Sequence, residues 1–179
     1  IDIITGGVGV GDDLVLVGTA AGEIVALFQS DGSLAWRSIV ASEVLAPPQV
    51  SNQLVVAQSI DGSVTGLDAF TGERRWRFNT PPPALTLRGT STPILRDDVV
   101  IAGFANGRVA LIDPDRGIAA IDERVAAAKG RSDLERLIDI DGKMIFQNGR
   151  LFVASYQGRI LAIDLNAGRP LWSEDVSTT

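Results

Sequence analysis

The sequence predicts an all-β fold, a β-propeller built from four-stranded antiparallel blades, and three observations lead to this prediction. A strand-like segment recurs four times, at spacings of 40, 45 and 51 residues. All three tryptophans of the chain fall on one position of this repeat. Glycine-bearing turns separate the short apolar runs within each copy. A period near 40 to 50 residues with several strands per copy is typical of propeller blades.

The repeat is numbered from one aligned glycine in each copy, namely Gly22, Gly62, Gly107 and Gly158. Position +6 is aspartate in three copies (Asp68, Asp113, Asp164) and Phe28 in the first. Position +10 is glycine in all four copies (Gly32, Gly72, Gly117, Gly168). Position +14 is tryptophan in three copies (Trp36, Trp76, Trp172) and Ile121 in the third. The same four-strand unit is therefore expected four times.

Each copy predicts its strands in the same order. An apolar run gives a buried strand, a glycine turn follows, and an alternating strand leads through a second glycine turn to an outer strand that carries the tryptophan. A less regular innermost strand, marked by Pro47, Pro48 or Pro93, precedes the apolar run. The repeat motifs cover residues 14–36, 54–76, 99–121 and 151–172. We expect residues 1–179 to form a single partial propeller of about four blades.

The repeated residues are interpreted as structural. The glycines supply turns with positive φ, and the aspartate at +6 accepts hydrogen bonds from backbone amides of the turn that follows it. The tryptophan packs its ring between neighbouring blades and bonds its N–H to backbone. A repeat architecture needs the same packing in every copy, so these residues predict the fold. Residues that carry the function are expected in the segments that are not repeated.

Composition excludes several classes of function. The chain contains no cysteine and no histidine, which removes thiol nucleophiles, histidine triads and the usual zinc ligands. Its net charge of −6 leaves no basic footprint for nucleic acid. No apolar run approaches the roughly 18 residues that span a bilayer. We predict no catalytic residue, no metal site and no cofactor. The first residues, Ile1 to Thr5, resemble a strand entered midway, so the chain is expected to be a piece of a longer protein.

Two connections between copies are enlarged. From the tryptophan position to the next apolar run takes 18 residues after Trp36, 23 after Trp76 and 30 after Ile121. The added residues fall in segments 80–92 and 126–142. Equivalent connections leave a propeller on the same face, so two consecutive enlarged loops are expected side by side on a binding face.

Five residues in these loops are predicted to contact a partner. Leu85, Leu87 and Arg88 lie in the first loop, and Asp139 and Asp141 lie in the second. Apolar anchors beside arginine and carboxylates are the composition of a protein-binding patch. The structural alternative is that the leucines close the core, the arginine pairs internally and the aspartates shape a turn. A calcium loop is disfavoured because further oxygen ligands are missing.

Several motifs carry a resemblance to known families. The pattern in Gly66-Leu-Asp68, Gly72 and Trp76 is similar to the repeat of quinoprotein-type (PQQ-like) propellers. The unrepeated segments Leu85-Thr-Leu-Arg-Gly89 and Arg136-Leu-Ile-Asp-Ile-Asp141 resemble, more specifically, the BamB family. Its members are propeller lipoproteins of the outer-membrane β-barrel assembly machinery (the BAM complex) in Gram-negative bacteria. The resemblance covers the whole chain.

The resemblance implies a non-enzymatic scaffold, lipid-anchored to the periplasmic face of the cell outer membrane. It also implies an eight-bladed ring, of which four blades are half, and binding to the POTRA domains of BamA. The family's contact residues correspond to Leu85, Leu87, Arg88, Asp139 and Asp141. This chain departs from the family in its lack of a lipidated cysteine, in Ile121 and in Gly142, where the family tends to have proline.

Two alternatives remain open beside this assignment. One is a fragment of a PQQ-dependent dehydrogenase with calcium in the propeller channel. The missing adjacent cysteine pair, and the lack of a carboxylate and arginine set on the inner strands, count against it. The other is a periplasmic propeller with a different protein partner. In each case the two end faces of a four-blade arc would expose apolar surface, so we also expect self-association of half-propellers.

Overall fold

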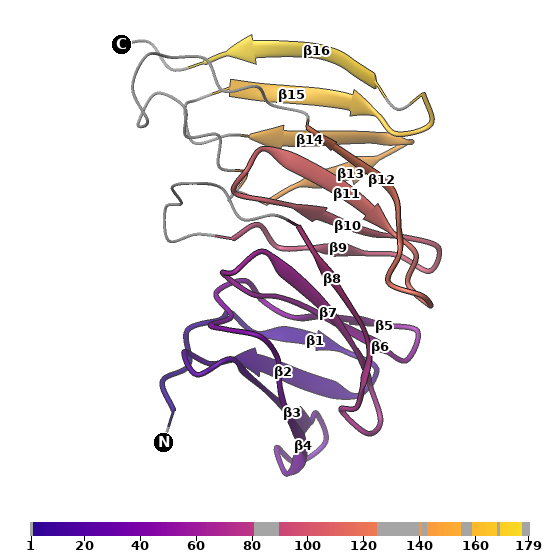
Figure 1. Ribbon diagram of the computed structural model, residues 1–179. Coiled ribbons are helices and arrows are strands. Elements are labelled where there is room, and N and C mark those ends of the chain that lie inside the picture. The colour runs from indigo at the N-terminus through magenta and orange to yellow at the C-terminus, as the bar shows by residue number, and fades with distance from the viewer. Residues whose placement is uncertain are drawn as a thin grey trace.

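The structure, a computed structural model, describes residues 2–80, 90–124, 140, 143–154, 159–167 and 169–176. These residues form four sheets, each of four antiparallel strands in chain order. The sheets follow one another along the molecule, from the N-terminal sheet at the bottom of Figure 1 to the C-terminal sheet at the top. We number them blades 1 to 4. The predicted class, a propeller of four-stranded blades, is confirmed.

The strands of each blade are short. Blade 1 contains β1 (Gly9–Gly11), β2 (Leu14–Gly18), β3 (Glu23–Phe28) and β4 (Leu34–Ile39). Blade 2 contains β5 (Gln49–Ser51), β6 (Leu54–Gln58), β7 (Ser63–Asp68) and β8 (Arg74–Asn79). Blade 3 contains β9 (Ile94–Leu95), β10 (Val100–Gly103), β11 (Arg108–Ile112) and β12 (Ala119–Arg124). Blade 4 contains β13 (Ile145–Gln147), β14 (Arg150–Ala154), β15 (Arg159–Asp164) and β16 (Arg169–Asp175). Among the described residues there is no helix that is long and apolar enough to cross a membrane.

The turns define two opposite faces. Strands alternate in direction, so the first and third turns of every blade lie at the same end. In Figure 1 these turns form the right-hand side of the molecule, which we call the hairpin face. The second turn of each blade and the connections to the next blade lie on the other side, which we call the connection face. Segments 80–92 and 126–142 are connections of this second kind.

The innermost strands of neighbouring blades touch one another, since β1 contacts β5 and β5 contacts β9. Pro47 and Pro48 come directly before β5, and Pro93 comes directly before β9. The sequence prediction placed these prolines within the inner strand. They lie just outside it because a residue without an N–H cannot donate to the pairing with β6 or β10.

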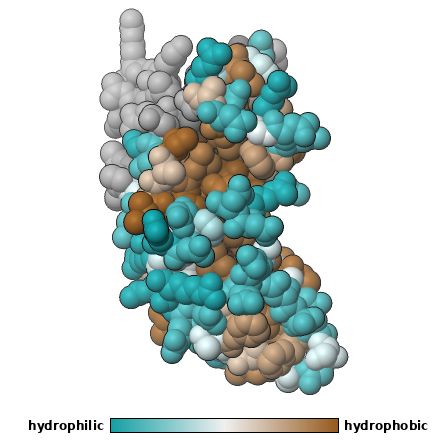
Figure 2. Space-filling view, turned by 90° about the vertical axis from the view of Figure 1, so that its right-hand side faces the viewer, coloured by the Kyte–Doolittle hydropathy of each residue, from teal (hydrophilic) through white to brown (hydrophobic). Residues whose placement is uncertain are grey.

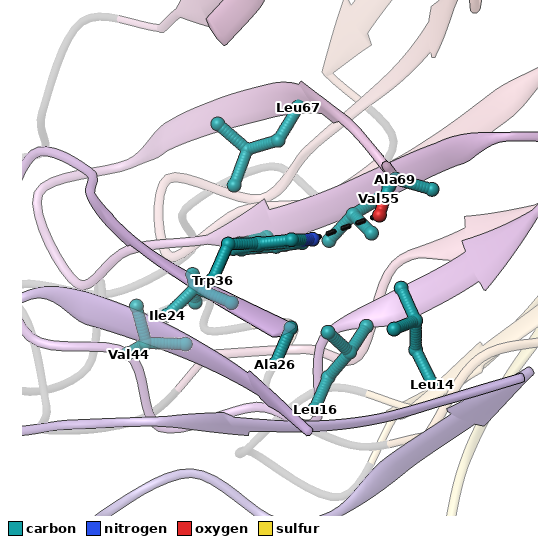
Figure 3. Close-up of a cluster of buried hydrophobic side chains, with 10 residues drawn as sticks. Leu14, Leu16, Ile24, Ala26, Trp36, Val44, Val55, Leu67 and Ala69 are labelled. Carbon is teal, nitrogen blue, oxygen red and sulfur yellow. Dashed lines mark hydrogen bonds between the residues drawn. The ribbon is translucent and has the colours of Figure 1, made fainter. Parts of the chain in front are cut away.

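Trp36 and Trp76 lie buried between consecutive blades, as predicted. The indole nitrogen of Trp36 donates a 2.8 Å hydrogen bond to the carbonyl of Ala69 in blade 2, which Figure 3 shows as a dashed line. Trp76 repeats this contact with the carbonyl of Pro114 in blade 3, at 2.6 Å. The first core cluster surrounds Trp36 with aliphatic side chains from both blades, so the tryptophan closes the core and joins the blades at once.

The residue opposite each tryptophan is small. Ala26 pairs with Trp36 across β3 and β4, and Gly66 pairs with Trp76 across β7 and β8. A Cβ added at Gly66 would lie 2.3 Å from Cε2 of Trp76, so the ring needs the glycine. In blade 3 the equivalent pair is Leu111 and Ile121. Leu111 on β11 is larger than its counterparts and thus compensates for Ile121 on β12, which is smaller than tryptophan. The interface between the blades therefore stays filled, although blade 3 has no tryptophan at this position.

The aspartate at +6 holds the turn that follows it, as predicted. Oδ1 of Asp68 accepts hydrogen bonds from the amides of Phe70 and Thr71, both at 2.9 Å. The same pair of amide bonds recurs at Asp113 and at Asp164. These repeated bonds fix the third turn of blades 2, 3 and 4 on the hairpin face.

Candidate protein-binding surface

The five predicted contact residues lie outside the described residues. Leu85, Leu87 and Arg88 fall in segment 81–89, and Asp139 and Asp141 fall in segments 125–139 and 141–142. The described residues on either side of these segments show where each enlarged connection is attached to the blades.

Both ends of the first connection are fastened to blade 3. Thr80, buried directly after β8, accepts a 3.2 Å hydrogen bond at its Oγ1 from the side-chain amide of Asn106 in the turn between β10 and β11. At the other end, the hydroxyl of Ser91 donates to the carbonyl of Gly103 at 2.8 Å and accepts from its amide at 3.2 Å. The connection thus leaves blade 2 and returns beside the same hairpin of blade 3.

The second connection is anchored at the same glycine. Ile140 and Met144 are buried in the core cluster that joins blades 3 and 4. A Cβ added at Gly103 would lie 2.7 Å from Cγ2 of Ile140 and 3.0 Å from Sδ of Met144. Since Ser91 is hydrogen-bonded to Gly103 as well, the described ends of both connections meet at this residue. Its missing side chain is what allows them to approach so closely.

The surroundings of Gly103 also include buried polar groups. The side-chain amide of Gln58, from the end of β6, donates a 2.7 Å hydrogen bond to the Gly103 carbonyl, which therefore accepts two bonds. Oε1 of Gln58 and Oγ1 of Thr90 are buried without a hydrogen-bond partner among the described residues. Buried polar groups favour a partner strongly. The two connections are thus attached beside fixed, buried polar groups. Two of these groups, Oε1 of Gln58 and Oγ1 of Thr90, have no hydrogen-bond partner among the described residues.

Cross-strand ion pairs border the connection face. Nε of Arg108 lies 2.6 Å from Oδ1 of Asp122, and the same guanidinium donates to the Asp122 carbonyl. Arg37 and Glu23 form the equivalent pair in blade 1, at 3.0 Å and with the charges exchanged between the strands. Both pairs are partly exposed, so each contributes under about 1 kcal/mol to stability. These pairs place charged side chains along the edges of the blades, and the two opposite charges of each pair cancel.

The described residues bring together no three metal-ligating side chains. A cavity of about 460 Å³ runs along the inner strands of blades 2 to 4, between Gln49, Pro93 and Phe146. Lys143 is the one charged side chain among the described residues that line it. A quinone cofactor with calcium requires carboxylates and arginine around it, so these lining residues do not fit that group.

Sequence reasoning did not single out Thr80, Ser91, Gly103 and Ile140 as the anchors of the two connections. One feature of the sequence could have indicated Gly103. Position −4 of the repeat is small in three copies, as Gly18, Gly103 and Ala154. A small residue at the end of a strand indicates that another segment approaches closely. The identity of that segment depends on a contact across about 40 residues, which no local pattern encodes.

Comparison with known proteins places these features in a family. A protein-family model for the outer membrane protein assembly factor BamB matches residues 2–179. The BamB protein of Bordetella pertussis is 35% identical over 176 residues, which is 98% of this chain and 45% of that protein. The chain spans about half the length of the curated relatives it matches.

Two solved structures are informative. The crystal structure of BamB from Moraxella catarrhalis superposes with a TM-score of 0.91 at 33% identity, covering 99% of this chain and 55% of that one. The quinohemoprotein alcohol dehydrogenase of Comamonas testosteroni superposes with a TM-score of 0.76 at 15% identity, covering 96% of this chain and 35% of that one. The second similarity shows the fold alone.

Proposed function

Because the chain belongs to the BamB family of outer membrane protein assembly factors, we propose that it serves as a non-enzymatic adaptor in the assembly of outer-membrane β-barrel proteins. The partner in this proposal is the set of POTRA domains of BamA. The protein acts at the periplasmic face of the outer membrane, held there by a lipid anchor of the full-length protein.

One observation carries the proposed binding site. Both enlarged connections are fastened at Gly103, on the connection face and beside one hairpin of blade 3. Connections attached at a common point present their unrepeated residues over a small area. A rigid attachment also lowers the entropy lost when loops bind a partner. Surface loops on a rigid scaffold are where binding residues concentrate.

Each of the five residues has a role in this proposal. Leu85 and Leu87 fill an apolar depression on a POTRA domain, and Arg88 makes a charge-assisted hydrogen bond to a carboxylate or carbonyl there. Asp139 and Asp141 flank the buried Ile140 in the sequence. Their carboxylates hold the Arg88 loop or meet a basic group of the partner.

The enzyme alternative has less support. Dehydrogenases with this fold are similar at only 15% identity, whereas the relatives named assembly factors reach 35% over nearly the whole chain. The described residues that line the inner cavity also include no carboxylate and no arginine, which a quinone cofactor with calcium requires. A solution of the purified protein should therefore show no absorption band of a bound quinone in the near-ultraviolet and visible range.

Titration calorimetry with an isolated fragment of POTRA domains tests the proposal. Arg88→Ala, and separately the double change Leu85→Ala with Leu87→Ala, should each weaken binding by at least about tenfold, as expected for arginine and apolar anchors. Arg169→Ala, an exposed position in β16 near the hairpin face, is the control and should bind like the unaltered chain.

Thermal unfolding of the same variants separates binding from folding. The melting temperatures should stay close to that of the unaltered chain, because the proposed residues act at the surface. If Arg88→Ala binds normally, or if it unfolds the protein, the patch is structural and the proposed site is wrong.

A further inference from the structure

Blades 1 and 2 each carry an exposed phenylalanine where the repeat has a polar residue. Phe28 is at position +6, which is aspartate in the other three copies. Phe70 is at position +8, where the other copies have Ser30, Asp115 and Asn166. Phe28 is 45% exposed and Phe70 is 73% exposed. Exposed apolar side chains that lie together, rather than singly, mark candidate interaction sites.

The two phenylalanines lie on the same groove. It has a volume of about 500 Å³ and runs between blades 1 and 2 on the hairpin face, opposite the connections. Among the described residues, its lining consists of Asp12, Asp13, Leu14, Phe28, Ala35, Asn52, Gln53, Ala69 and Phe70. Figure 2 shows this face, with brown apolar areas over the lower blades set among teal polar residues. Five of these nine lining residues are apolar, namely Leu14, Phe28, Ala35, Ala69 and Phe70.

Local structure does not require either aromatic ring. Blade 1 holds its third turn without the usual aspartate, because Oδ1 of Asp31 accepts from the amide and the hydroxyl of Ser33, at 2.9 and 2.7 Å. In blade 2 the amide of Phe70 bonds to Asp68, a contact that any side chain at that position permits. The rings therefore serve neither turn.

The rim of the groove is negatively charged. The turns of blades 1 and 2 on this face, residues 11–13, 28–34, 51–53 and 68–75, contain five carboxylates and two arginines, a net charge of 2 − 5 = −3. Asp12 is fixed in place, since its Oδ2 accepts the amide of Gln53 from the neighbouring blade at 2.8 Å. Asp12 and Asp13 line the groove directly, so apolar side chains and carboxylates lie side by side.

We propose that this groove docks an extended segment of a partner protein in which an aromatic side chain is flanked by arginine. The aromatic ring packs against Phe28 and Phe70, and the guanidinium groups pair with Asp12 and Asp13. Charge complementarity selects this occupant. A second copy of the chain would bring an equally acidic face, and an anionic lipid surface would be repelled. The groove is independent of the site proposed for POTRA domains, because it lies on the opposite face.

Fluorescence anisotropy with a labelled peptide tests the proposal. The probe is the heptapeptide Gly-Ser-Arg-Phe-Arg-Ser-Gly. Two matched peptides replace its phenylalanine by serine or both arginines by glutamate. The first peptide should bind, and each replacement should weaken binding by at least about tenfold. Raising the salt concentration should weaken binding of the arginine peptide, because exposed charge pairs are screened.

Variants of the protein restore the polar residues of the repeat. Phe28→Asp and Phe70→Ser should each raise the dissociation constant of the probe at least about tenfold while the protein stays folded by circular dichroism. Ile118→Ser is the matched control, because Ile118 is 63% exposed near the same face of blade 3 but does not line the groove. It should bind the probe as the unaltered chain does.

Three results would overturn the proposal. The first is no saturable binding of the arginine peptide, and the second is equal binding by the Phe28→Asp and Phe70→Ser variants. The third comes from light scattering. If Phe70→Ser converts an associated form of the protein to monomer, the groove binds a second copy of the chain instead.

Discussion

The indole nitrogen of Trp36 lies 2.8 Å from the carbonyl oxygen of Ala69, and this hydrogen bond joins blade 1 to blade 2. The ring of Trp36 also packs directly against Gly72, three residues further along blade 2. Trp76 makes the same two contacts with blade 3, at Pro114 and Gly117. Trp36 and Trp76 therefore each fit a backbone site made by positions +7 and +10 of the next blade.

Gly72→Ala should destabilise the protein through this seam. A Cβ there would lie 2.6 Å from Cε3 of Trp36, and the backbone has a φ of +73°. A left-handed conformation costs a residue with a side chain about 1 kcal/mol or more, and the overlap with the ring adds a further 1 to 3 kcal/mol. Urea unfolding followed by tryptophan fluorescence should show a free energy of unfolding lower by about 2 to 4 kcal/mol.

Gly32→Ala is the matched control for this prediction. Gly32 occupies the same repeat position with a φ of +72°, but a Cβ there meets nothing within 4 Å. In the monomeric chain, at low protein concentration, only the backbone cost of about 1 kcal/mol should remain. Equal losses at Gly32 and Gly72 would show that the ring contact contributes nothing.

The seams show what the sequence contains about the fold. The period, the turn glycines and the tryptophan at +14 predicted the blades, because each feature recurs at a fixed distance along the chain. The pairing of Trp36 with Gly72 was not predicted, since it joins different copies of the repeat. The balance between Leu111 and Ile121 was missed for the same reason. It appears only when β11 and β12 are paired in register.

The stability of the protein should fall in acid through Asp68. The hydrogen bond from Arg75, at 2.6 Å, lowers the pKa of Asp68 from 3.8 to about 2 in the folded protein. Because the folded pKa is the lower one, this contribution is present above about pH 4 and is lost as the pH falls from about 4 to 2. The carboxylate is partly exposed, so we expect about 1 kcal/mol.

Urea unfolding of Asp68→Asn between pH 7 and pH 2 checks this prediction. The variant should be less stable at neutral pH and should lack this part of the acid dependence. Arg75→Gln removes the ion pair but keeps the amide bonds of the turn, so it should shift the acid transition toward higher pH. An unchanged pH profile in both variants would contradict the role given to Arg75.

Gly103→Ala should weaken partner binding without changing any exposed residue. A Cβ at this position would lie 2.7 Å from Ile140 and 3.1 Å from the hydroxyl of Ser91, so both connections must shift at their base. We expect unfolding to become easier by about 1 to 3 kcal/mol. In calorimetry, the affinity for POTRA domains should fall by at least about threefold, because the two loops lose their common attachment.

Gly18→Ala separates these two effects. Gly18 holds the same repeat position in blade 1, and a Cβ there would lie 2.5 Å from Cγ1 of Val44. The free energy of unfolding of the Gly18→Ala variant should fall by a similar amount. Its binding to POTRA domains should be unchanged, because blade 1 carries neither enlarged connection. If Gly18→Ala weakens binding as much as Gly103→Ala, general destabilisation explains the loss.

The sequence predicts less of the candidate site than of the fold. The enlarged connections were found because they break the period, and their residue types suggested a protein partner. Their attachment at Gly103 depends on hydrogen bonds between Ser91 and a distant strand. The groove at Phe28 and Phe70 was also missed. The change from Asp to Phe at +6 was visible, but its meaning required the neighbouring blade beside it.

The two ends of the four-blade arc present complementary halves of the same seam, and this leads to the last prediction. Trp172 of blade 4 is 46% exposed, whereas Trp36 and Trp76 are buried. Gly32 of blade 1 holds the position that receives a tryptophan in blades 2 and 3, and the space beside it is open.

The 179-residue chain should therefore associate head to tail in sedimentation experiments, with Trp172 against Gly32 of a second copy. Trp172→Ala, and Gly32→Asn, which tolerates the positive φ but fills the space, should each weaken association by at least about tenfold. Ile60→Ala, at an exposed position in a turn of the connection face, should leave it unchanged. A monomer at all concentrations would contradict the prediction, and so would association that survives both changes.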